Sequence, residues 1–203
     1  QEFKQSLEKY LEVLREICAS GVITAGYVDK PSADLVVRLL EVASLSDEEI
    51  SDAKNLRPLQ GVTDRYLFQG LLQPGERSAV FAIRSRSALD YKGELALHFF
   101  YLNVGRFGKP WLARIEIPAW VAGNPQSLQN LHAVLFHQCQ VMGNRPFPYL
   151  IHRAHEIAVV TKEEKEQVAQ MIVAEHLRRG VPVDEMSYKQ SAKELKGRTR
   201  YER

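Results

Sequence analysis

The stretches LALHFFYLNV (Leu95–Val104) and WLARIEI (Trp111–Ile117) decide the fold of this chain. Both are rich in β-branched and aromatic residues, which favour extended backbone, and a turn-rich stretch separates them. Arg114 and Glu116 alternate with isoleucines in the second stretch, so one face of that strand is expected to be wet. SAVFAI (Ser78–Ile83) is a third candidate strand. Together the three predict a β-rich centre.

Helical patterns precede this centre. A first amphipathic helix is expected to end near Gly21, a residue suited to a left-handed cap, and VITAGYV (Val22–Val28) then predicts a buried strand. Pro31 suits the opening of a second helix, and Thr63 suits the N-cap of a third that runs through Leu72. The polar stretch 46–58 between them predicts loop with a turn of helix.

Helical patterns also follow the centre. An apolar stripe predicts a long helix over Ser127–Met142, and Tyr149–Glu156 can form two further turns. Ile157–Val160 reads as a strand, and Thr161 with Glu164 forms a capping box for a last helix. Helices therefore alternate with strands at both ends of a β-rich centre. This order favours an α/β domain with a mixed sheet.

The composition is that of an ordinary globular domain. The chain has 203 residues, of which 45% are hydrophobic and 26% charged. No apolar run reaches the length of a membrane span and no signal-peptide pattern is present, so we expect a cytoplasmic protein. Cys18 and Cys139 lie on apolar helical stripes without CxxC spacing, which favours reduced core thiols. Residue 1 is Gln1 within a helical pattern, so we expect further natural sequence upstream.

Positive charge is concentrated at the carboxyl end. The net charge is only +2, too small to indicate a nucleic-acid partner by itself. We expect one domain over residues 1–186 and a basic tail over residues 187–203. Such a tail could contact the phosphates of a nucleic-acid backbone, or it could be a solvated terminal helix. Its basic residues are Lys189, Lys193, Lys196, Arg198, Arg200 and Arg203.

FPYLIHRAHEIAVV (Phe147–Val160) places ionisable groups in an apolar segment. His152, Arg153, His155 and Glu156 fall within five positions, and burying an unpaired charge costs several kcal/mol. The segment is therefore either a helix with one wet face or a site. Its HRAHE order differs from the HExxH and HxxEH signatures of zinc peptidases, so that class has little support.

Other polar residues have ordinary interpretations. Asp29 and Asp64 precede predicted helices, where a carboxylate caps backbone N–H groups, and capping outweighs metal ligation for both. His98, His132 and His137 are expected to be hydrogen-bonded or on the surface. The chain lacks the GxxxxGK[ST] and GxGxxG motifs, so the sequence does not support a P-loop or Rossmann nucleotide site. It also lacks GxSxG, the motif of the usual nucleophile elbow.

Seven phrases of the sequence stand in a characteristic order. They are AGYVDKP, SADLVVRLLEVA, TDRYLFQGLLQPGERSAVF, HFFYLNVG, RIEIPAWVAG, LHAVLFHQC and FPYLIHRAHEIAVVTKEE. Each phrase alone is weakly specific, and their order is the stronger signal. The series resembles the carboxy-terminal two-thirds of NurA-type nucleases, and the likeness extends from about Gly21 to Gly180.

The resemblance implies an RNase H-like fold and a manganese-dependent 5′ to 3′ nuclease that acts on DNA ends in double-strand break repair. It also implies a homodimer and a partner, the hexameric ATPase HerA. His155 matches the family's metal-site histidine. Tyr149 is the nearest candidate for the family's site tyrosine, although Phe147 could be the positional match. Arg153 and the tail residues Lys189, Lys193, Lys196, Arg198 and Arg200 are expected to contact DNA.

The sequence departs from the family pattern at its start. It contains no DGS motif, and its first 20 residues have a helical pattern, so the family's leading carboxylates are not found in this chain. A two-metal site needs carboxylates that hold two cations, and one histidine cannot replace them. We therefore expect the chain alone to bind Mn²⁺ poorly and to be inactive. The alternative is a non-catalytic module that dimerises and docks on DNA or on an ATPase.

Overall fold

The computed structural model describes residues 2–85, 87–143, 145–159 and 161–180. The chain divides into two compact units, Gln1–Ala154 and His155–Arg203. The basic tail and the predicted boundary between residues 186 and 187 lie outside the described residues. Within the described ranges, no helix has the length and apolar character needed to cross a membrane.

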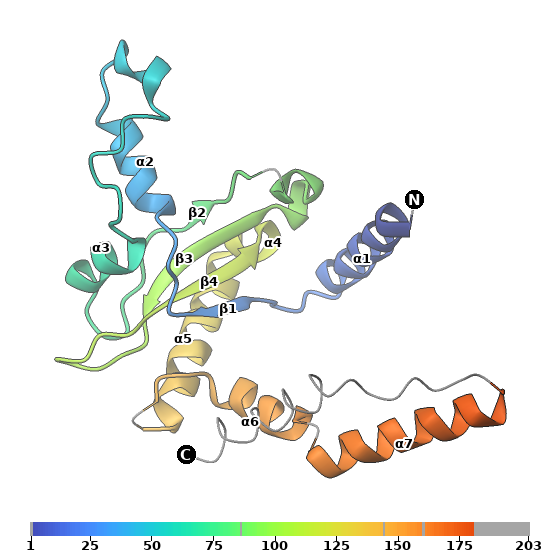
Figure 1. The fold of residues 1–203 in the computed structure, drawn as a ribbon. Helices are drawn as coiled ribbons and strands as arrows, with labels where there is room; N and C mark the ends of the chain where they lie inside the picture. The colour runs from blue at the N-terminus through green and yellow to red at the C-terminus, as the bar shows by residue number, and fades with distance from the viewer. Residues whose placement is uncertain (1, 86, 144, 160, 181–203) are drawn as a thin grey trace. The chain divides into compact units, whose positions relative to one another are not determined.

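A four-stranded sheet forms the centre of the first unit (Figure 1). Its order is β1-β4-β3-β2, and every neighbouring pair is antiparallel. The prediction of an α/β domain is confirmed, but the parallel pairing that a mixed sheet requires is absent from the described strands. The strands are β1 (Gly26–Asp29), β2 (Phe81–Ala82), β3 (Leu97–Asn103) and β4 (Leu112–Pro118).

The two central strands lie where the sequence predicted them, whereas β1 and β2 are shorter than expected. The segment before β2 still runs beside β3, because the Ser78 N–H donates to the carbonyl of Tyr101 at 2.9 Å. The Tyr101 N–H then donates to the Ser78 hydroxyl at 2.9 Å instead of to a backbone carbonyl. Because a side-chain hydroxyl replaces the backbone carbonyl as acceptor here, the ladder of backbone hydrogen bonds is interrupted and β2 is only two residues long.

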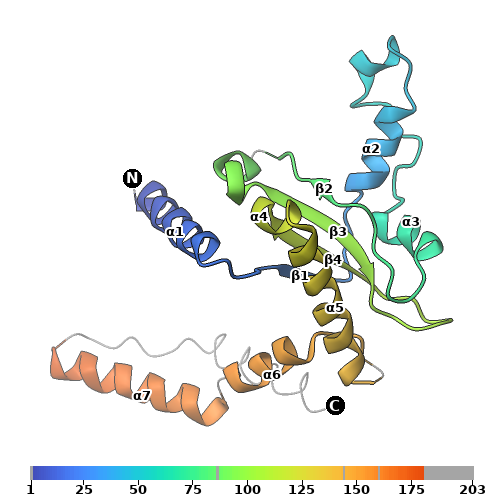
Figure 2. The same cartoon turned by 180° about the vertical axis from the view of Figure 1, so that it is seen from behind.

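Strand β3 is buried on both faces, because successive side chains of a strand point to opposite sides. Phe100 and Leu102 lie in one apolar cluster, and Phe99 and Tyr101 lie in the other. Helices α4 (Ala119–Ala122) and α5 (Pro125–Val141) cover the first cluster through Val121, Leu128 and Cys139. Figure 2 shows α5 lying across this face of the sheet.

Helices α2 (Leu35–Ala43) and α3 (Asp64–Leu71) cover the second cluster through Val36 and Phe68. Arg114 and Glu116 point to this same side of the sheet and form an ion pair at 2.6 Å. Both side chains are half-buried and not fully exposed to solvent. The predicted polar face of β4 is therefore partly covered by helices. Thr63 is the N-cap residue of α3, as predicted, although its side chain makes no capping hydrogen bond.

Asp64 caps a different helix from the one it begins. Its buried carboxylate accepts the N–H groups of Val36 and Val37 at 2.8–3.0 Å, so it caps α2. The prediction that Asp64 caps a helix is confirmed, but the capped helix lies 27–28 residues earlier in the chain. The predicted opening of α2 at Pro31 is too early, because the helix begins at Leu35.

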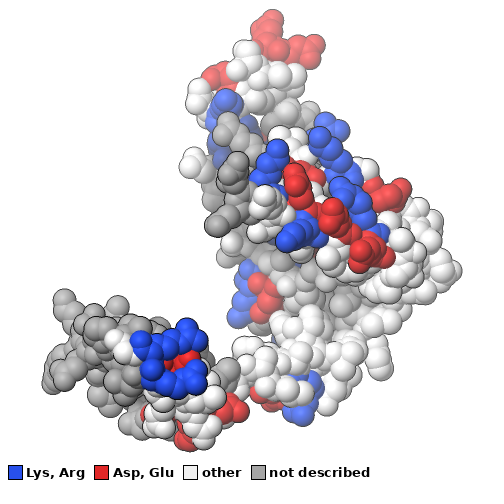
Figure 3. Space-filling model, turned by 90° about the vertical axis from the view of Figure 1, so that its right-hand side faces the viewer, with Lys and Arg blue, Asp and Glu red and all other residues white. Residues whose placement is uncertain are grey.

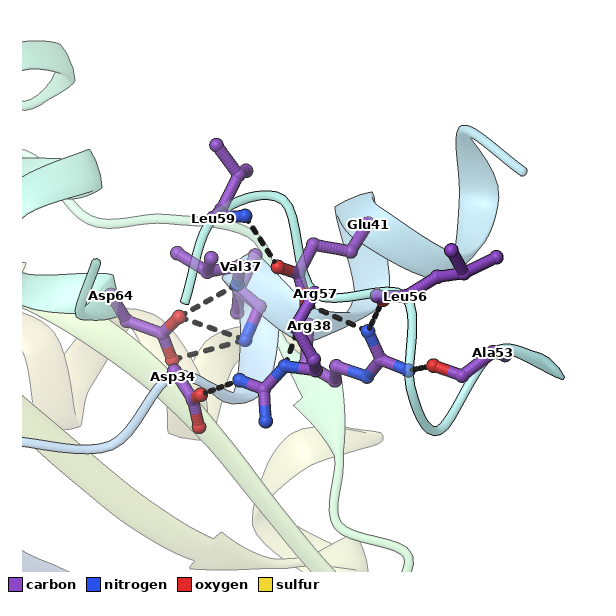
Figure 4. A network of polar contacts seen from close by, with 10 residues as sticks. Asp34, Val37, Arg38, Glu41, Ala53, Leu56, Arg57, Leu59 and Asp64 are labelled. Carbon is purple, nitrogen blue, oxygen red and sulfur yellow. Dashed lines mark hydrogen bonds and ion pairs between the residues drawn. The ribbon is translucent and has the colours of Figure 1, made fainter. Parts of the chain in front are cut away.

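A buried glutamate holds the loop between α2 and α3 (Figure 4). This loop contains the short 3-10 helix η1 (Glu49–Asp52), in agreement with the predicted turn. The Glu41 carboxylate accepts hydrogen bonds from Arg38 at 2.7 Å and from the Leu59 N–H at 2.8 Å, and Arg57 pairs with it at 3.2 Å. The Arg38 hydrogen bond lowers the pKa of Glu41, so the carboxylate stays ionised despite its burial.

The remaining helices mostly follow the sequence pattern. They are α1 (Glu2–Ala19), η2 (Ser87–Asp90), η3 (Gly93–Leu95), α6 (Tyr149–Ala158) and α7 (Lys162–Arg178). The capping box is confirmed, since the Thr161 N–H donates to Glu164 at 2.7 Å and the Glu164 N–H donates to the Thr161 hydroxyl at 3.2 Å. The predicted strand at Ile157 is wrong, because α6 continues through Ala158 with no Gly or Pro to end it earlier.

Candidate functional site

The segment that leads into α6 is fastened to both a strand and a helix of the first unit. The Tyr27 hydroxyl of β1 donates to the carbonyl of Pro146 at 3.4 Å, and its ring meets Phe147 edge-on at 5.3 Å. The Leu150 N–H donates to the side chain of Gln138 on α5 at 2.9 Å. These contacts set the place from which α6 begins.

The predicted site residues that the structure describes lie on or beside α6, whereas Lys189, Lys193, Lys196, Arg198 and Arg200 lie outside the described residues. Tyr149 is the first residue of α6 and is 38% exposed, whereas Phe147 lies two residues earlier and is half-buried. Arg153 and His155 are exposed. His152 and His155 are one helical turn apart. The interpretation of this segment as a helix with a single exposed face is not borne out, because α6 has no buried residue and its apolar residues Leu150 and Ile157 are exposed.

A pocket of about 350 Å³ opens where the end of β1, the start of β4 and the entry to α6 meet. Its aromatic wall is Trp111, whose indole N–H donates to the Asp29 carboxylate at 2.8 Å. The Lys30 ammonium lies 4.7 Å from the centre of the Trp111 ring. The pocket is lined by Asp29, Lys30, Trp111, Met142, Arg145, Pro146, Phe147 and His152.

Asp29 does not cap a helix, so that prediction is wrong. The residue ends β1 opposite Ala113, which turns its carboxylate toward the start of β4 and the indole of Trp111. Lys30, which follows, has a left-handed backbone with φ of 50°, unusual for a residue other than glycine. This turn carries the chain from β1 toward α2, which begins only at Leu35.

Burial raises the pKa values of two groups next to the residues that line the pocket. It raises the pKa of the Cys139 thiol to about 11, and it raises the pKa of the Tyr27 hydroxyl well above its usual range. The Cys139 thiol lies 3.9 Å from the Tyr27 hydroxyl. A protonated, buried thiol is a poor nucleophile, so Cys139 has a packing role. Both cysteines are free, as predicted, but only Cys139 is a core residue, because Cys18 is half-buried.

The described side chains do not form a two-metal centre. Across the part of the chain that the structure places, no three His, Cys, Asp or Glu residues come together in a group that could hold a metal ion. His98 and His132 are engaged with backbone carbonyls of Ala96 and Gly75 at 3.0 and 2.8 Å, in agreement with their ordinary interpretation. The donors present therefore do not fit the Mn²⁺ site that the resemblance implies.

On one face of the described residues, charge alone does not indicate a binding surface. Figure 3 shows a face on which lysines and arginines are interspersed with aspartates and glutamates. Such mixing agrees with the small net charge of +2 and gives no extended field of one sign.

A comparison with protein families decides the class of the protein. The NurA domain matches over residues 2–160, which is more than half of the chain. The chain belongs to the NurA family. It is therefore a member of a nuclease family, and the predicted resemblance is confirmed. No curated protein and no solved structure matches it.

The NurA match includes the sheet, the pocket and all of α6, but neither α7 nor the basic tail. Sequence reasoning missed the pocket, because Asp29 and Trp111 are 82 positions apart. The signal that could have found it is RFGKPW (Arg106–Trp111), where cationic and aromatic residues are interleaved.

Proposed function

We propose that this chain is part of a metal-dependent, DNA end-processing nuclease. The observation that carries the proposal is the NurA match over residues 2–160, which contains both the folded sheet and His155. Hydrolysis adds water across one phosphodiester P–O bond and leaves a phosphate monoester and a hydroxyl. In this proposal the antiparallel sheet is part of an RNase H-like fold.

His155 is the proposed metal ligand and catalytic residue of this chain. Its exposure on α6 leaves the imidazole accessible to an ion or a substrate. Tyr149, at the start of the same helix, is the second proposed catalytic residue, with Phe147 as its positional alternative. The carboxylates that a two-metal Mn²⁺ centre needs would come from sequence upstream of this chain.

The wider proposal follows the family resemblance. The enzyme would cut DNA 5′ to 3′ and would also cut single strands internally, in double-strand break repair. It would act in the cytoplasm as a homodimer with a HerA-type hexameric ATPase. Arg153 would contact DNA near the site, and its exposure on α6 is compatible with that role.

A second candidate is a non-catalytic module that dimerises and docks on DNA or on an ATPase. The observation that favours it is the lack of a metal-holding group among the residues with described positions. Under this alternative the NurA fold is retained as a scaffold, and His155 is a surface residue.

A cleavage assay separates the two. A 5′-labelled single strand is incubated with Mn²⁺ and either this chain or the chain extended upstream by a segment with a DGS motif. We expect degradation only by the extended protein, with loss of activity in EDTA. Degradation by this chain alone would place the metal site within it, and inactivity of the extended protein would favour the module.

A further inference from the structure

The hairpin between β3 and β4 carries cationic and aromatic side chains in alternation. Its loop contains Arg106, Phe107 and Lys109, and Trp111 lies at its foot. Phe107 is 84% exposed, an unusual position for a phenylalanine at a hairpin tip. Arg106 and Lys109 are exposed on either side of it and pair through their backbones.

Hydrogen bonds and close backbone packing join the segments at the foot of this hairpin. The buried Asn103 side chain accepts the N–H groups of Gly105 and Trp111 at 3.0 and 3.1 Å and donates to the carbonyl of Leu72 at 2.8 Å. A Cβ on Gly105 would lie 2.4 Å from the backbone of Lys109 and Trp111, so only glycine fits there. Trp111 is therefore held in place before any ligand arrives, which lowers the entropic cost of binding.

The pocket at this foot combines an aromatic wall with positive charge. Trp111 is oriented by Asp29, and Lys30 and Arg145 supply two cations at the rim. Neither cation forms an ion pair with another described residue. A volume of about 350 Å³ lies within the range of small-ligand pockets and accommodates one nucleotide unit.

We propose that the hairpin tip and this pocket together bind single-stranded DNA, with one base against Trp111, a second against Phe107, and phosphates beside Lys30, Arg106 and Lys109. Aromatic rings that alternate with cations are the usual means of holding a single strand without reading its sequence. The inference rests on the proposed nuclease function for the identity of the ligand, but the surface would bind DNA whether or not the chain cuts it.

Binding is measured by the fluorescence anisotropy of a labelled oligothymidylate in EDTA, which excludes cleavage. Phe107→Ala is expected to raise the Kd about five- to hundredfold, the usual range for loss of one stacked base. Tyr66→Ala is the matched control, since Tyr66 is an exposed aromatic residue on α3 (73%). Lys30→Gln should lower the slope of log affinity against log salt by about 0.7, and Lys54→Gln, also exposed, should not change it.

Trp111 is tested through its fluorescence. The chain has only one other tryptophan, Trp120, so a variant that lacks Trp111 shows which of the two responds to DNA. The oligonucleotide should quench wild-type emission, and Trp111→Leu should abolish the quenching and weaken binding. Trp111→Phe should restore part of the affinity, since it retains an aromatic face. Thermal melting checks that each variant is folded.

A strand with abasic sites supplies the sharpest comparison. It should bind the wild type more weakly than oligothymidylate does, and it should bind Phe107→Ala and wild type alike. If Phe107→Ala, Trp111→Leu and Lys30→Gln all bind oligothymidylate as tightly as the wild type does, the inference is overturned and the nuclease proposal still stands. Absence of any binding by the wild type would also overturn it, whereas inactivity in the separate cleavage assay counts only against the nuclease proposal.

Discussion

The hydroxyl of Tyr101 donates to the carboxylate of Asp64 at 2.7 Å, and so joins helix α3 to the central strand β3. The same carboxylate caps α2 through the N–H groups of Val36 and Val37. Both side chains are fully buried, and burial raises the pKa of Tyr101. One carboxylate therefore fastens two helices and a strand on one face of the sheet.

Asp64→Ala should destabilise the fold by about 3 kcal/mol or more, because three buried donors lose their acceptor and each costs roughly 1–3 kcal/mol. Tyr101→Phe should cost less, about 1 kcal/mol, since it removes one hydrogen bond and leaves the cap of α2 intact. Urea unfolding followed by circular dichroism measures both. Equal losses in the two variants would contradict the capping role of Asp64.

Stability should fall at alkaline pH. The pKa values of Cys139 and Tyr27 are raised in the folded protein, that of Cys139 from 9.0 to about 11. The unfolded chain therefore loses these protons at lower pH than the folded chain, so the stabilisation is complete below about pH 9 and declines as the pH rises through 11.

The measurement is the melting temperature between pH 7.5 and pH 10.5. Tyr27→Phe removes one of the two ionisations and should lose less stability over this interval than the wild type. The melting temperature of each protein is compared with its own value at pH 7.5. This corrects for the hydroxyl contacts with Pro146 and Cys139 that Tyr27→Phe removes. A melting temperature that falls equally in both proteins would show that Tyr27 does not contribute.

Local sequence signals predicted the elements with the strongest patterns. The apolar and aromatic run of Leu95–Val104 gave a strand, and Thr161 with Glu164 gave a helix start, because each signal is contained within a few residues. Strand partners are not local. The lengths of β1 and β2 depend on register with β4 and β3, which no short pattern specifies.

Long-range contacts also explain what was missed at the site. The role of Asp64 depends on a helix 27 residues earlier, and the pocket joins Asp29 to Trp111 and to the entry of α6. His155 was predicted as a site residue from a family likeness and not from geometry, and it stays a prediction. The apolar residues Leu150 and Ile157 of the same helix are 62% and 77% exposed, so they are not core residues.

His155→Ala, in an active protein that contains this chain, should lower the cleavage rate by at least about 100-fold, the scale of a lost acid–base or ligand residue. Its stability should change by less than about 0.5 kcal/mol, because the side chain is exposed. Leu150→Ala and Ile157→Ala are controls on the same helix and should also cost about 0.5 kcal/mol or less, with normal cleavage. A His155 variant that melts much earlier but still cuts in the cold would show a structural role.

Removal of Ser187–Arg203 tests whether the tail binds DNA. The deletion takes away six basic and two acidic side chains, a net of four positive charges. If these contact phosphates, the slope of log affinity against log salt for a duplex should become shallower by up to about 3–4, since each neutralised phosphate contributes about 0.9. Sequence preference should not change, because phosphate contacts carry no sequence information.

A salt series with one oligonucleotide, measured on intact and truncated protein, gives the slope. If the tail docks on a HerA-type ATPase instead, truncation would weaken that complex and leave the salt slope unchanged, and an unchanged slope would rule out a DNA-binding tail.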